Sequence, residues 1–428
     1  MVPKTKRITP FLTLKTVCTD KFKTERISVT IETLPHKRIT PIEQFAFSVL
    51  KRGCESYPTQ RALNIRCDEL YSASVSPVFL PGGGKHRIGF AAEMLGDGFV
   101  DESVFEKTLA LLFDVFWNPL LDENGQFIKK YVESERENIC DAVRSAKNNP
   151  RMYAIKRLIE IMYEGDEYSF STRGSVDTVN SITIDELIEA YRNLVENSSY
   201  EVFYVGAKSS EEVEKAVLKF FEKSGFGKEK IIENKVTFDV DTKKVKRVNE
   251  TMQLAQGKLV IGFKTGVNIT CGNDFYAMVM LNEIYGATAV SKLFLNVRER
   301  LGLCYYCTSR YDVHKGFIFV VCEIDPDDRK KAEKEIIKYL KEIKKGRITD
   351  TEFESAKKSL LSVYSETMDS AVSIERFYML REEYGVTDTV DDAKMAIEAL
   401  TVSDVIRVSK NIELDTVYFL YGENNNDD

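Results

Sequence analysis

The chain has 428 residues, a formal net charge of −7 and 43% apolar residues, which is enough for folded cores and excludes an intrinsically disordered protein. Its length favours two domains or one large duplicated unit, and its acidic balance without a long basic block argues against a nucleic-acid partner. It has no run of roughly 20 apolar residues and no N-terminal export signal, so we expect a cytoplasmic protein without a membrane span.

The first part of the chain alternates strand and helix patterns. The run RISVTIETL at 26–34 predicts a strand, and the apolar segment IEQFAFSVLKRG that follows predicts a helix. A capping box of Thr183 and Glu186 starts a further helix, which leads into an aromatic-rich strand ending at Gly206. Other helices are predicted at 103–117, 126–146, 151–163 and 208–222.

The second part of the chain repeats this order. The run KLVIGFKTG at 258–266 matches the strand at 26–34, and an apolar helical segment again follows it. Thr401 and Asp404 repeat the capping pattern before a closing aromatic strand. Helices are predicted at 327–345, 351–367 and 371–384. Runs of strands mixed with runs of helices predict an α+β fold, in which helices pack on one face of an antiparallel-rich sheet.

The repeat gives a domain division. We predict an N-terminal half-domain at 1–222, a linker at 223–250 and a C-terminal half-domain at 251–428. The linker is charged, contains glycine and is poor in core residues.

The eight cysteines are expected to be reduced thiols of the core, because the chain is long and has no export signal. Only Cys304 and Cys307 form a C-x-x-C pair. If residues 303–310 form a strand, alternation places these two thiols on opposite faces, and a zinc site would need further ligands. We therefore expect no metal and no cofactor in this chain.

The duplicated layout, together with the stretch SKLFLNVRERLGLCYY in the second half, resembles the insulinase/pitrilysin-like metallopeptidases, or inverzincins. The resemblance covers nearly the whole chain. It implies that two homologous half-domains form one clamshell lobe, and that two such lobes enclose a chamber where an unfolded peptide is cut. The family's zinc motif, H-x-x-E-H, lies on the first helix of the first lobe.

The resemblance assigns the three motif places to Gln44, Phe47 and Ser48. Glutamine and serine are poor zinc ligands and phenylalanine cannot act as a base. The third zinc ligand of the family corresponds to Asp141 or Ala142. The chain has only three histidines, with none at i, i+4 spacing, so a self-sufficient zinc protease is not expected and we assign no catalytic residue.

The resemblance also implies a substrate-binding pair, an arginine near the end of a helix and a tyrosine seven residues later. Arg298 and Tyr305 have this spacing, on either side of Gly302, which we expect to end a helix at 289–300 and begin a strand. A guanidinium and a phenol can hold a substrate backbone and stabilise negative charge on an attacked carbonyl oxygen. The alternative is an arginine that faces solvent and a tyrosine that only packs.

These features resemble the split form of the family, in which a subunit without zinc completes the site of an H-x-x-E-H-bearing subunit. We therefore expect a bacterial, inactive peptidase homologue that binds peptide within a heterodimer, or pairs with itself when alone. Two alternatives stay open: a structural or assembly scaffold with the same fold, and an enzyme that uses an unrecognised site of its own.

Overall fold

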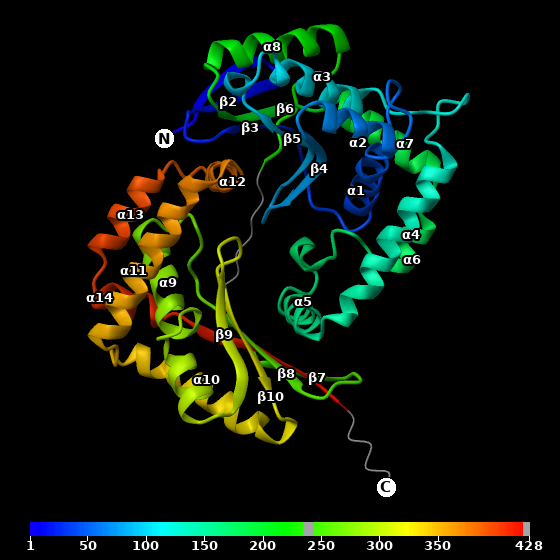
Figure 1. Cartoon of the computed structure of the whole chain (residues 1–428). Coiled ribbons are helices and arrows are strands. Elements are labelled where there is room, and N and C mark those ends of the chain that lie inside the picture. Colours follow the sequence, from blue (N-terminus) through cyan, green and yellow to red (C-terminus); the bar gives the residue numbers. More distant parts are fainter. Residues whose placement is uncertain (234–243, 423–428) are drawn as a thin grey trace. The chain divides into compact units, whose positions relative to one another are not determined.

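The computed structural model describes residues 1–233 and 244–422, which form two compact units, each built around one sheet (Figure 1). The described part of unit 1 comprises residues 1–144, 170–233 and 369–383, and that of unit 2 comprises residues 145–169, 244–368 and 384–422. Neither unit is a continuous half of the chain.

The sheet of unit 1 has six strands in the order β1-β2-β6-β3-β5-β4. All neighbouring pairs are antiparallel except β2 and β6. The strands are β1 (Lys4–Thr9), β2 (Leu12–Cys18), β3 (Thr24–Thr33), β4 (Ser74–Pro81), β5 (His86–Leu95) and β6 (Tyr200–Gly206).

One face of this sheet carries the apolar core of unit 1. Phe47, Phe90 and Phe116 pack together there, with ring centroids 5.5 to 6.1 Å apart, and join α1 and α3 to β5. The helices of this unit are α1 (Ile39–Leu50), α2 (Gln60–Glu69), α3 (Val104–Trp117), α4 (Lys129–Ser145), α6 (Val176–Ser181), α7 (Ile184–Glu196), α8 (Ser210–Ser224) and α12 (Ala371–Glu383).

The opposite face of the first sheet is charged and is met by α12. Arg26 Nε lies 2.5 Å from a carboxylate oxygen of Glu375, which is buried. Lys15, also buried, forms ion pairs with Glu201 of β6 and Glu382 of α12. These pairs satisfy charges that would otherwise be costly to bury.

Unit 2 repeats the strand order of unit 1 with one strand fewer. Its sheet runs β7-β11-β8-β10-β9, and only β7 and β11 are parallel. The strands are β7 (Lys246–Thr251), β8 (Gly257–Lys264), β9 (Cys304–Asp312), β10 (Phe317–Ile324) and β11 (Glu413–Tyr421). The helices are α5 (Pro150–Met162), α9 (Asn273–Asn282), α10 (Arg329–Lys344), α11 (Asp350–Glu366), α13 (Val390–Ala399) and α14 (Val402–Ser409).

Helix α5 comes from the first half of the chain but packs on the sheet of unit 2. Leu158, which is fully buried, belongs to the same apolar cluster as Val260, Phe319 and Tyr418 of that sheet. In return, α12 of the second half packs on the sheet of unit 1. Each unit therefore takes one helix from the other half of the chain, an exchange that a single boundary does not describe.

Most predicted elements lie where the patterns placed them, and the α+β fold with two antiparallel-rich sheets is confirmed. Helices are not confined to one face, because α12 packs on the face of the first sheet opposite its apolar core. Strand β7 also begins inside the stretch predicted as a linker. The capping boxes at Thr183 and Thr401 are both present. Residues 234–243 of the predicted linker lie outside the described residues. In the described part of the chain, no helix has the length and apolar character needed to cross a membrane.

Candidate functional site

Arg298 and Tyr305 lie on consecutive elements of unit 2. Arg298 belongs to a π-helical segment, Phe294–Arg300, which is shorter than the helix expected over 289–300. At its end the Leu301 N–H donates to the Asn296 carbonyl at 3.2 Å, an i to i−5 bond. Gly302 then takes a positive φ of 57°, a conformation that glycine adopts at little cost, and the chain enters β9 at Cys304.

Strand β9 begins with an irregularity centred on Tyr305. Cys304 pairs with Ile324 of β10 and Tyr306 pairs with Glu323, so two steps along β9 match one step along β10. This is the geometry of a β-bulge, in which the extra residue is left out of the ladder and can be aimed differently from its neighbours. The Tyr305 residue is 79% exposed, whereas Tyr306 contacts the apolar cluster under α5.

The Arg298 guanidinium lies over the rings of two aromatic residues. Its central carbon is 5.6 Å from the ring centroid of Tyr305 and 4.5 Å from that of Phe294. The Arg298 side chain is 35% exposed, and its Nε lies 3.4 Å from a carboxylate oxygen of the adjacent Glu299. The two residues chosen from the sequence are thus side by side, and the Tyr305 ring is exposed.

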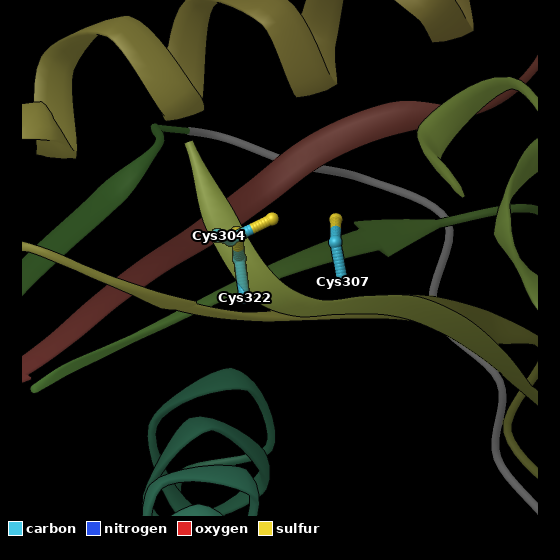
Figure 2. Close-up of side chains that lie close together, drawn as sticks. All are labelled: Cys304, Cys307 and Cys322. Atoms are coloured by element: carbon cyan, nitrogen blue, oxygen red, sulfur yellow. The ribbon is translucent and has the colours of Figure 1, made fainter. Parts of the chain in front are cut away.

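The bulge also changes the position of the cysteines. Cys307 is directly opposite Cys322 in the ladder, and the bulge brings Cys304 onto the same face, opposite Ile324. The expectation that Cys304 and Cys307 lie on opposite faces is therefore wrong, because simple alternation ignores the extra residue at Tyr305. The three sulfur atoms lie within 4.8 Å of one another (Figure 2).

The three thiols are not equivalent. Hydrogen bonds from the Cys307 and Cys322 thiols, with a smaller contribution from the nearby Arg298 charge, lower the pKa of Cys304 to about 4 despite its partial burial. Hydrogen bonds with Cys304 and Cys307 raise the pKa of Cys322 well above its ordinary value. Among residues 1–233 and 244–422, these cysteines are the only group of three or more potential metal ligands from His, Cys, Asp and Glu that converge.

The three positions of the expected zinc motif lie on α1, in unit 1. Phe47 is buried in the aromatic core, the Gln44 amide donates to the Thr172 carbonyl at 2.7 Å, and the Ser48 hydroxyl donates to the Gln44 carbonyl at 2.9 Å. The three residues line an open pocket of about 520 Å³, together with Pro77, Val78, Phe79, Ile88, Ser171, Thr172 and Arg173.

The expected place of a third ligand lies on α4. Asp141 is exposed and accepts a hydrogen bond from Arg144 one turn later, and Ala142 has no side-chain ligand atom. The buried carboxylate of α4 is Glu135, which sequence reasoning did not select. It is paired with Lys51 at 3.1 Å and with Arg52, both of which follow α1. The Glu135 carboxylate is therefore already paired with two cationic side chains, and these ion pairs link α4 to the residues that follow α1.

Comparison with known proteins decides the family. A model of the peptidase M16 inactive domain matches residues 181–360. A relative from Bacillus subtilis (strain 168), named "Probable inactive metalloprotease YmfF", is 30% identical over 418 residues, which is 96% of each chain. The chain belongs to the M16, insulinase-like peptidase family. The resemblance inferred from SKLFLNVRERLGLCYY is confirmed.

Two further comparisons agree with this finding. The solved structure of a conserved protein from Enterococcus faecalis V583 superposes with a TM-score of 0.91 over the whole of both chains, at 24% identity, which supports the fold. A second Bacillus subtilis (strain 168) relative, named "Uncharacterized zinc protease YmxG", is 23% identical over 269 residues, 62% of each chain. The M16 inactive-domain match and the name of the first relative support an inactive M16 peptidase-like protein.

Proposed function

We propose that this chain is the non-catalytic, substrate-binding subunit of a heteromeric zinc peptidase. Arg298 and Tyr305 contribute to a composite active site, and an H-x-x-E-H-bearing homologue supplies the zinc. The observation that carries the proposal is the juxtaposition of the Arg298 guanidinium and the exposed Tyr305 phenol, 5.6 Å from group to ring centroid, in a chain whose zinc-motif positions hold Gln44, Phe47 and Ser48.

The local structure supports a role beyond packing. An exposed tyrosine on a bulge buries little apolar area and so adds little to the stability of the fold. A π-helical segment is also rarer than a regular helix end. Both irregularities recur next to binding and catalytic sites in proteins. Here they occur together within eight residues, from Arg298 to Tyr305, and they leave the phenol exposed.

The chemistry of the pair suits a peptide substrate. Attack of a zinc-bound hydroxide on a peptide carbonyl places negative charge on the oxygen, which guanidinium and phenol donors stabilise. The same donors can hold the substrate backbone before the reaction. A partner with an intact motif fits the comparisons, because one organism, Bacillus subtilis (strain 168), holds both a relative named an inactive metalloprotease and one named a zinc protease.

The test is hydrolysis of a peptide by the chain mixed with an H-x-x-E-H homologue from the same organism. Arg298→Ala is expected to lower kcat/KM of the complex by about 100-fold, because losing one such donor costs about 3 kcal/mol of transition-state stabilisation. Arg298→Lys is expected to recover only part of the activity, since lysine keeps the charge but not the planar fork.

Arg347→Ala is the matched control, because Arg347 is an arginine of the same unit with a side chain 68% exposed and is expected to be replaceable. If Arg298→Ala and Tyr305→Phe both leave hydrolysis unchanged while the complex still forms, the chain is a scaffold and the proposal fails. Peptide turnover by the isolated chain would instead reveal an active site of its own.

A further inference from the structure

The cluster of Cys304, Cys307 and Cys322 is a chemically distinct feature of unit 2 (Figure 2). Its three sulfur atoms come from two neighbouring strands and lie within 4.8 Å of one another. Cys307 and Cys322 face each other across the ladder, and the bulge at Tyr305 adds the third sulfur to the same face. A regular β9 would have turned Cys304 away.

Three converging thiols without a disulfide form a soft ligand set. We propose that Cys304, Cys307 and Cys322 bind one thiophilic metal ion, of the class that includes Zn²⁺, Cd²⁺ and Cu⁺. This site is separate from the zinc-motif positions of α1, which belong to the other unit. It does not depend on the proposed peptidase function.

Two of the three thiols are buried, and the third lies at the side from which an ion can enter. Cys322 and Cys307 are 0% and 5% exposed, whereas Cys304 is half-buried and next to the exposed Tyr305. An approaching ion therefore meets Cys304 first. Three protein ligands would leave a trigonal ion complete, or a tetrahedral ion with one open position.

The charge of the bound state follows from the ligand set. Binding replaces the thiol protons, which leave to solvent, so three thiolates and a divalent ion carry a net charge of −1. Cys304 precedes the bulge residue Tyr305 and Cys307 follows it, so a bound ion would link both sides of the bulge to Cys322 of β10.

The site is tested on the full-length chain, reduced and freed of metal with a chelator. Titration with Cd²⁺ is expected to saturate at one ion per chain, with the ultraviolet charge-transfer absorption of cadmium bound to thiolates. Competition against a chromogenic chelator for Zn²⁺, and against a copper(I) chelator for Cu⁺, gives the relative affinities. Cys322→Ala is expected to weaken Cd²⁺ binding by at least about 100-fold, as loss of a ligand exceeds the loss caused by outer contacts.

Two controls make the result decisive. Cys18→Ser removes an exposed thiol outside the cluster and is expected to leave binding intact. Because Cys322 is fully buried, circular dichroism checks the folding of its variant, and Cys304→Ser, at the half-buried position, serves as a second variant. The proposal is overturned if the reduced chain binds no ion at one per chain, if both cluster variants still bind Cd²⁺, or if only Cys18→Ser abolishes binding.

Discussion

Glu43 is a single buried carboxyl on α1, next to the first degenerate zinc position. It is 7% exposed, and one of its oxygens has no hydrogen-bond partner. Burial raises the pKa of Glu43 from its ordinary 4.5 to about 7. The folded chain therefore holds a proton on Glu43 at pH values where the unfolded chain has lost it.

The free energy of unfolding should consequently fall as pH rises from about 4.5 to about 7, because over this range the native state binds more protons than the unfolded state. Glu43→Gln is expected to remove this dependence and to stabilise the chain above pH 7, by up to about 3 kcal/mol for a shift of this size. Urea unfolding at pH 5 and pH 8 measures the effect, with the fluorescence of Trp117, the single tryptophan and a residue of unit 1, as reporter. Equal pH slopes for wild type and variant would contradict it.

At the scale of an element, α5 is held to the second sheet by its apolar face. Leu158→Ala is expected to destabilise unit 2 by about 3 kcal/mol, because the removed side chain is fully buried and leaves a cavity. Met152→Ala on the same helix removes a side chain that is 52% exposed, so its effect should stay within about 0.5 kcal/mol. Amide hydrogen exchange of β8 measures the effect of each variant. Similar losses of protection in Leu158→Ala and Met152→Ala would contradict the view that the apolar face of α5 holds it to the second sheet.

At the scale of the whole molecule, the exchange of α5 and α12 makes the two halves of the chain incomplete. Residues 1–233 alone would expose the apolar face of α5 and leave Lys15 without Glu382, and residues 244–428 alone would lack α5 over β8 and β11. We expect each half to be poorly folded alone and the two to co-purify when expressed together. Leu158→Asp in the first half should reduce this association. Two halves that are each monomeric and stable would contradict the expectation.

Sequence patterns predicted much of this fold because they reflect local physics. Gly302 marks the end of the Arg298 helix through a conformation that few other residues adopt, and the capping box at Thr183 fixes the start of α7. Arg298 and Tyr305 were selected through the family resemblance, and across the turn at Gly302 the Arg298 guanidinium carbon lies 5.6 Å from the Tyr305 ring centroid.

The features that escaped prediction depend on partners distant in the chain. The apolar face of α5 predicts burial but does not state which sheet buries it. The run CYYC contains no signal for an extra residue and was treated as a regular strand, and only its register with β10 reveals the bulge and hence the cysteine cluster. Glu135 was missed because an acidic residue on a polar helix usually faces solvent, and its cationic partners follow a different helix.

The extra residue at Tyr305 has a consequence for how this stretch can change during evolution. Deleting Tyr306 would remove the bulge, so that Tyr305 pairs with Glu323 while Cys304 stays opposite Ile324. Such a single-codon deletion would leave the Cys304 sulfur on the face of the other two thiols, but it would move the phenol from its exposed place on the bulge to the face on which Tyr306 now lies. A homologue with one residue fewer in this segment can therefore keep the three thiols together, whereas the exposed phenol depends on the extra residue.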